Sequence, residues 1–148
     1  MAKQADLVKR IIAAVADLVI LAVVGFVIMA IFGAPLAFMS MASDPLQAAA
    51  IASSMMAASL ISILISLAYF VYFEGTTGQT IGKKLVNIKV VMVKSGRQIE
   101  YADALVRNIL RIIDFLPVFY ILGLILIAAS ENKQRLGDMA AKTIVVEA

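Results

Sequence analysis

Two long runs of apolar residues dominate the first half of the chain. The first extends from Ile11 to Phe32, where Gly33 and Pro35 end it, and the second from about Leu46 to Phe73. A helix of either length crosses a hydrocarbon core of about 30 Å, because each residue adds about 1.5 Å. The pattern therefore predicts two transmembrane helices joined by a short loop.

The second half of the chain alternates between polar and apolar stretches. The loop Glu74–Glu100 is basic and contains the β-branched stretch Asn87–Val93, followed by a Ser95–Gly96 turn signal. It predicts a strand and a tight turn outside the membrane. A third apolar segment, Tyr101–Ser130, carries charges in its first half, and the tail after it ends in a second β-branched run, Thr143–Val146.

The distribution of basic residues predicts the topology. All 13 Lys and Arg residues lie before the first run, in the basic loop, in the third segment or in the tail. The positive-inside rule therefore predicts a cytoplasmic N-terminus in a multi-pass protein of the cell membrane. The charge-free part of the third segment, Phe115–Ala129, is short for a span and contains Pro117.

Two arrangements of this third segment stay open. A re-entrant or half-inserted helical hairpin, bent near Pro117, would keep both β-branched runs in the cytoplasm, where they can pair as a small sheet. A third full crossing would separate them. In either case we expect one domain over residues 1–148: an all-α membrane protein with two transmembrane helices, a third helical segment and a small cytoplasmic β-element.

Composition agrees with a lipid environment. Hydrophobic residues make up 63% of the chain and charged residues 16%. A soluble domain of this size could not bury the apolar surface of so many hydrophobic residues. The chain has no Cys and no His, so zinc sites and Cys or His catalysis are excluded, and no other metal or cofactor site is predicted. The bases flank apolar runs rather than forming an aromatic-rich basic face, which favours anionic lipid headgroups over nucleic acid as partners.

Asp17 lies inside the first apolar run. A charge there costs about 2.5–3.5 kcal/mol on insertion scales, so we expect the side chain to face protein or water. Arg10 lies seven residues earlier, which is about 10.5 Å along a helix axis and too far for a direct bridge. Asp17 is therefore predicted to pair with a base from another segment.

The third segment offers such bases. Asp103, Arg107, Arg111 and Asp114 follow one another at spacings of four, four and three residues, so they share one helical face. We predict that Arg107 or Arg111 pairs with Asp17 and docks the two helices. The alternative is an interfacial helix whose charges lie among the headgroups and contact no other part of the chain.

A line of hydroxyl groups follows one face of the second run, at Ser59, Ser62, Ser66 and Tyr69. Such a line is typical of a close-packing surface for a neighbouring helix. A polar path for ions is the other interpretation.

These residues together resemble the RDD family of small prokaryotic membrane proteins, named for one arginine and two aspartates. The family's arginine and first aspartate match Arg10 and Asp17. Its loop, strand, arginine-bearing and terminal motifs correspond to "GQTIGKKL" from Gly78, "VVMVKSGRQI" from Val90, "ALVRNILRIID" from Ala104 and "QRLGDMAAKTIVV" from Gln134. Asp138 and Asp114 both qualify as the second aspartate, and we favour Asp138 because it lies in the terminal motif.

The "GQTIGKK" stretch itself is not a phosphate loop, because only three residues separate its glycines and Lys84 follows Lys83. We expect the glycines to permit a tight turn and the lysines to bind phospholipid headgroups.

The resemblance implies an integral membrane protein, and exchange of monovalent cations for protons is a proposed role of some relatives. Our first hypothesis is accordingly transport, or an accessory role in it. The candidate ion or proton site is Arg10, Asp17 and Asp138, with Arg107, Arg111 and Asp114 as candidate partners. Because two or three spans are few for a transporter, we expect a homo-oligomer.

The second hypothesis is a non-transporting structural or interaction module, whose buried ion pairs only fix helix packing. We do not expect an enzyme, because no nucleophile with an adjacent base is recognisable.

Overall fold

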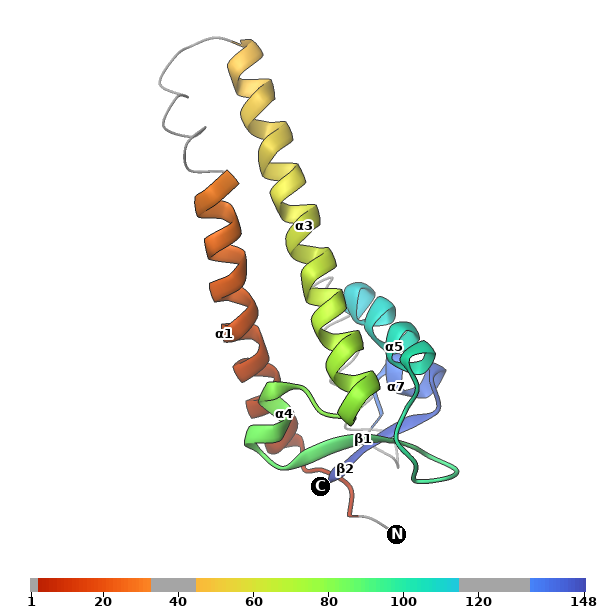
Figure 1. Cartoon of the computed structure of the whole chain (residues 1–148). Helices are drawn as coiled ribbons and strands as arrows, with labels where there is room; N and C mark the ends of the chain where they lie inside the picture. The colour runs from red at the N-terminus through yellow and green to blue at the C-terminus, as the bar shows by residue number, and fades with distance from the viewer. Residues whose placement is uncertain (1–2, 33–44, 115–133) are drawn as a thin grey trace. The chain divides into compact units, whose positions relative to one another are not determined.

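The computed structural model describes residues 3–32, 45–114 and 134–148 (Figure 1). They belong to two compact units, one formed by residues 1–17 and 67–148 and the other by residues 18–66. The predicted turn at Gly33 and Pro35 and the predicted bend near Pro117 lie outside the described residues.

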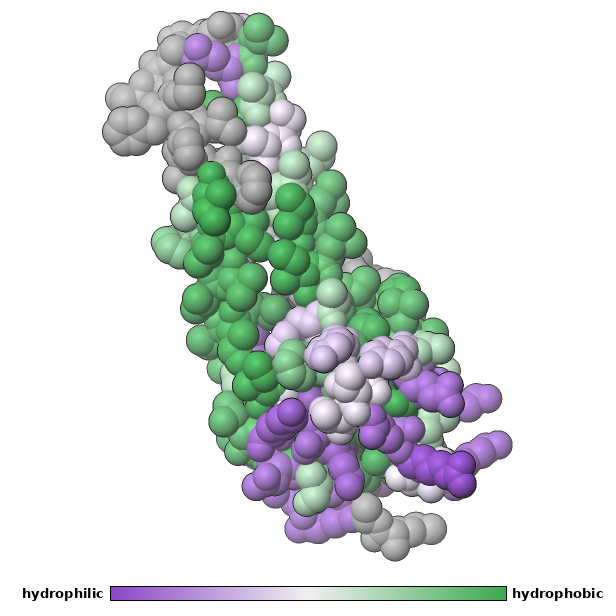
Figure 2. Space-filling model, in the orientation of Figure 1, coloured by the Kyte–Doolittle hydropathy of each residue, from purple (hydrophilic) through white to green (hydrophobic). Residues whose placement is uncertain are grey.

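Two helices in the described part of the chain are long and apolar enough to cross a membrane. Helix α1 spans Leu7–Phe32 and helix α3 spans Pro45–Thr77. Large apolar side chains on both are exposed, among them Phe26 at 75% and Leu64 at 63%, and Figure 2 shows hydrophobic residues along both helices. Exposed apolar surface of this kind is what a helix presents to lipid.

Both helices are longer than the apolar runs that predicted them. Helix α1 begins four residues before Ile11, directly after Asp6, whose carboxylate accepts the Leu7 N–H at 2.8 Å. Helix α3 continues past Phe73 to Thr77, because its end is set by Gly78 rather than by hydropathy. Gly78 has φ +69°, and its N–H donates to the Glu74 carbonyl at 2.9 Å.

The two β-branched runs pair, as the re-entrant arrangement of the third segment predicts. Strand β1, Ile88–Met92, is antiparallel to strand β2, Thr143–Glu147, with Val90 opposite Val145. The predicted turn also follows β1, where Gly96 has φ +63° and donates its N–H to the Met92 carbonyl at 2.9 Å.

The segment before α1 adds to the other edge of β2. Gln4 forms a bridge with Val146, and the Ala5 N–H donates to the Val145 carbonyl at 3.0 Å. The C-terminal strand therefore lies between β1 and the beginning of the chain (Figure 1). Parts of the sequence that precede α1, follow α3 and end the chain share one set of backbone hydrogen bonds.

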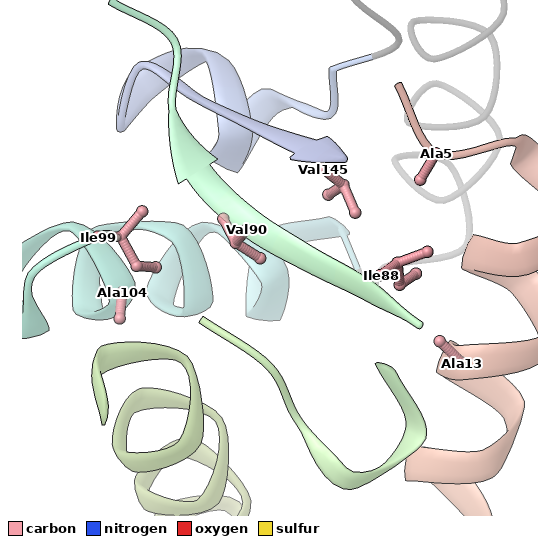
Figure 3. Packing of buried hydrophobic residues seen from close by; sticks show 7 residues of the cluster. All are labelled: Ala5, Ala13, Ile88, Val90, Ile99, Ala104 and Val145. Carbon is pink, nitrogen blue, oxygen red and sulfur yellow. The ribbon is translucent and has the colours of Figure 1, made fainter. Parts of the chain in front are cut away.

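A small core surrounds this sheet (Figure 3). Helix α5, Tyr101–Asp114, contributes the fully buried Ala104. Other members come from the strands, from α1 and from the connecting segments; they are Ala5, Ala13, Ile88, Val90, Ile99 and Val145. Because several of these side chains are small, the backbones of neighbouring elements approach closely.

Two helices of one to two turns were not predicted. Helix α4 spans Ile81–Leu85 and helix α7 spans Leu136–Ala140. Both are too short to show a helical hydrophobic period. Helix α7 packs on α5 so closely that a Cβ on Gly137 would lie 2.7 Å from the Arg107 carbonyl oxygen.

Candidate functional site

The carboxylate of Asp17 is 1% exposed and is bound by three neutral donors. The Tyr69 hydroxyl donates to Oδ1 at 2.9 Å, the Thr80 hydroxyl to Oδ2 at 2.6 Å, and the Gly82 N–H to Oδ1 at 2.8 Å. The expectation that Asp17 faces protein is met. The predicted pairing with Arg107 or Arg111 is wrong, because neither guanidinium lies within 4.0 Å of this carboxylate.

The sequence around Gly82 explains why these donors reach Asp17. Thr80 is the N-cap of α4 and accepts the Lys83 N–H at 3.3 Å, which fixes the first turn of that helix. A Cβ on Gly82 would lie 2.2 Å from the Ala13 carbonyl oxygen. The small residues Ala13 and Gly82 thus let α4 touch α1 beside Asp17.

Glu74 is the centre of the charge network, although sequence reasoning placed it at the start of a solvated loop. Its side chain is 1% exposed. Lys83 Nζ forms a short ion pair with Oε1, Arg107 Nε lies 3.4 Å from Oε2, and Asn108 Nδ2 donates to Oε2 at 3.0 Å. The sequence did hold a signal for the burial of Glu74, because this acid directly follows an apolar run, where an unpaired charge is costly.

Asp138 joins two arginines that are far apart in sequence. Arg107 Nη2 lies 3.0 Å from its Oδ1, and Arg10 Nη1 lies 3.9 Å from its Oδ2. The Arg135 backbone N–H also donates to Oδ2, at 3.2 Å. Asp114 ends helix α5, and its side chain lies outside the described residues. Of the two candidates for the second signature aspartate, the structure thus brings Asp138 to Arg10.

Arg107 connects the two acidic centres, because the same side chain contacts Glu74 and Asp138. Its Nη1 also donates to the Thr143 hydroxyl at 2.9 Å, at the start of β2. Arg10 reaches β2 as well, through a bond from Nη2 to the Val145 carbonyl at 3.3 Å. Helices α1, α3 and α5 and the tail are therefore tied to one another by charged side chains.

Arg111, four residues after Arg107, stacks on an aromatic ring. Its guanidinium carbon lies 3.9 Å from the centroid of Phe70. Asp103, on the same face of α5, accepts the Glu100 N–H at 3.2 Å and so caps the helix. Asp103, Arg107 and Arg111 therefore neither pair with Asp17 nor lie without contacts, so both sequence interpretations of this face need correction.

Lys83 was expected to bind headgroups, which is wrong, because its side chain is only 11% exposed and is committed to Glu74. Burial lowers the pKa of Lys83 to about 8, although the nearby Glu74 carboxylate acts in the opposite direction. Lys84 is exposed, with its Nζ 5.7 Å from the centre of the Phe73 ring.

The serine hydroxyls of α3 are satisfied within their own helix. Ser59, Ser62 and Ser66 each donate to the carbonyl four residues earlier, at 2.8–2.9 Å. The hydroxyl hydrogens are therefore used within α3 itself, and the hydroxyl oxygens keep their lone pairs. The described part of the chain contains no group of three side chains able to hold a metal ion.

A cavity of about 50 Å³ lies among these charges. Its charged lining residues in the described ranges are Arg10, Asp17, Lys83, Arg107, Arg111, Arg135 and Asp138. The candidate site residues with described side chains therefore surround one small space.

Comparison with known proteins agrees with the motifs. The chain is 33% identical over 89 residues to the uncharacterized membrane protein YteJ of Bacillus subtilis (strain 168), an alignment that covers 60% of this chain and 52% of the relative. The chain thus spans about half the length of that relative. No solved structure matches it. The RDD family matches residues 4–142, and the chain belongs to the RDD family of membrane proteins.

Proposed function

We propose that this chain is a non-transporting structural or interaction module of the membrane, in which the buried ion pairs fix the packing of the unit formed by residues 1–17 and 67–148, the polar unit. The observation that carries the proposal is that protein donors occupy the acids of the network. Asp17 accepts three hydrogen bonds, Glu74 contacts three donors, and Asp138 contacts two guanidiniums and a backbone N–H.

A transported cation would have to displace these donors. Removing a buried partner from a hydrogen-bonded charge costs several kcal/mol, because the group left behind is neither solvated nor paired. A site for Na⁺ or K⁺ instead presents oxygen atoms with free lone pairs. The donor arrangement therefore favours a structural role for Arg10, Asp17 and Asp138 over exchange of cations for protons.

The proposal includes a topology in which the polar unit lies in the cytoplasm. The shared backbone hydrogen bonds of the N-terminal segment, β1 and β2 support it, since all three must then lie on one side of the membrane. The clustering of bases in these segments supports the cytoplasmic side. In this topology α5 and α7 lie on the same side of the membrane, as the re-entrant arrangement expected from the sequence requires.

Flux measurements on Asp17→Asn test the proposal. Proteoliposomes receive an imposed pH gradient and a panel of monovalent cations. The structural role predicts that wild type and Asp17→Asn both pass ions at the rate of protein-free liposomes. Flux above that background in wild type, abolished by Asp17→Asn in a protein that still folds, would instead establish transport.

The same variant gives a stability prediction. An asparagine can keep its oxygen toward Tyr69 and Gly82 and donate its amide to the Thr80 hydroxyl, so Asp17→Asn should lower the free energy of unfolding by only about 1 kcal/mol. Asp17→Leu leaves three buried donors without an acceptor and should cost about 3 kcal/mol or more. Unfolding in mixed micelles, followed by circular dichroism, measures both.

A further inference from the structure

The cavity between α1, α5 and α7 carries more positive than negative charge. Five cationic side chains line it, namely Arg10, Lys83, Arg107, Arg111 and Arg135. The carboxylates that line it or bind its cations are three among the described residues: Asp17, Glu74 and Asp138. This leaves an excess of two positive charges around a largely buried space.

The excess is located on Arg111 and Arg135. Glu74 is committed to Lys83 and Arg107, and Asp138 to Arg10 and Arg107. Within the ranges that the structure describes, no carboxylate comes within 4.0 Å of the guanidinium of Arg111 or Arg135.

The contact that Arg111 makes with Phe70 does not occupy its hydrogen-bond donors. The guanidinium lies over the face of the Phe70 ring, and this contact does not use the N–H groups at its edge. Burial, together with the like charge of Arg135, lowers the pKa of Arg111 to about 10. An anion placed between the two guanidiniums would relieve their repulsion and accept their N–H groups.

The size of the cavity restricts the ligand. A volume of about 50 Å³ holds a few water-sized groups, since one bound water occupies about 10–15 Å³ by the same measure. A tetrahedral oxyanion with five heavy atoms is of this size, and the forked guanidinium binds two of its oxygens at once.

We propose that the cavity lined by Arg111 and Arg135 binds a phosphate group, supplied either by the headgroup of an anionic phospholipid or by free phosphate. The face of α5 that carries the exposed Tyr101, Leu105 and Ile109 is suited to the membrane interface, which is where lipid phosphates lie. This binding site goes beyond the structural role proposed above, and it does not require that role to be correct.

One experiment with two arms distinguishes a phospholipid headgroup from free phosphate as the ligand. The full-length protein is purified and its thermal unfolding is followed at constant ionic strength, with inorganic phosphate replacing chloride in one arm. In the other arm the protein is placed in nanodiscs of phosphatidylcholine with or without phosphatidylglycerol. Stabilisation by inorganic phosphate indicates a free anion, and stabilisation by phosphatidylglycerol alone indicates a lipid headgroup.

Matched variants locate the effect. Arg111→Gln and Arg135→Gln should each require about tenfold more of the effective ligand for the same stabilisation, whereas Lys94→Gln, an exposed base outside the cavity, should respond like wild type. In ligand-free buffer Arg135→Gln should be at least as stable as wild type, because a like-charge repulsion is removed.

The proposal is overturned if neither phosphate nor phosphatidylglycerol stabilises the wild type, a result that needs no variant to fold. It is also overturned if the two arginine variants and Lys94→Gln lose the response equally, which would indicate nonspecific attraction to the whole basic surface.

Discussion

The carboxylate of Asp17 is buried, and none of the described cationic side chains lies within ion-pair distance of it. Two hydroxyls and one backbone N–H occupy its oxygens, and two of these three donors are held in place by local features of α4. Thr80 is in place because it caps α4, and Gly82 because no side chain could fit there. At the residue scale, the "GQTIGKK" motif is thus a binding loop for an internal acid.

Gly82→Ala tests this close approach. A Cβ at residue 82 would overlap a backbone oxygen of α1, so we expect the free energy of unfolding to fall by about 1–3 kcal/mol. Gly25→Ala is the matched control, because a Cβ there meets nothing within 4 Å, and it should change stability by less than about 1 kcal/mol. Equal stability of both variants would show that α4 does not contact α1 as described.

The lowered pKa of Lys83 predicts how the stability of the fold depends on pH. Its pKa is about 8 in the folded chain against an ordinary 10.5, so between these values the unfolded chain holds a proton that the folded chain has released. By linkage this group makes folding more favourable as pH rises through that window.

Side-chain NMR of ¹⁵N-labelled lysines, with Lys83→Arg to assign the signal, should show a titration midpoint near 8. A midpoint at the ordinary lysine value would contradict the burial of this amine.

At the element scale, hydropathy predicted the parts that face lipid, and it missed the parts that face one another. The runs Ile11–Phe32 and Leu46–Phe73 lie inside α1 and α3, and the strand pairing followed from β-branched residues. The role of Glu74 was missed because the apolar run ends at Phe73, whereas helix α3 continues to Thr77. The end of an apolar run indicates the edge of the membrane and does not fix the end of the helix. The partner of Asp17 was misassigned because charge spacing does not reveal hydroxyl or backbone donors.

The sheet predicts where its strands lie relative to the membrane. The chain has no native cysteine, so single cysteines at Lys94 and Ala148 can report exposure. Both should be protected from an impermeant thiol reagent in intact cells and react after permeabilisation. A cysteine at Ser40, between the two apolar helices, should react from outside. Labelling of residue 148 from outside while residue 94 stays protected would contradict the shared sheet in the membrane-bound protein, and labelling of both would contradict the proposed orientation.

At the scale of the whole molecule, charged side chains join segments that hydrophobic packing alone would hold weakly. Arg107 contacts α3 through Glu74, the tail helix through Asp138 and β2 through Thr143. Such a network specifies one arrangement of the segments, because any other leaves a buried charge unpaired. The signature pair of Arg10 and Asp138 belongs to it, which gives these residues a structural reason to occur together in one sequence.

The most direct test of this account is a double-mutant cycle on Arg107→Gln and Asp138→Asn, read as the free energy of unfolding in mixed micelles. The less buried pair Lys9 and Glu147, whose side chains are 41% and 30% exposed, serves as the control and should couple by less than about 1 kcal/mol. If the buried charges hold the fold together, the Arg107 and Asp138 changes should couple by about 1–3 kcal/mol. Additive effects within about 0.5 kcal/mol would contradict the account, because the two groups would then not act on each other.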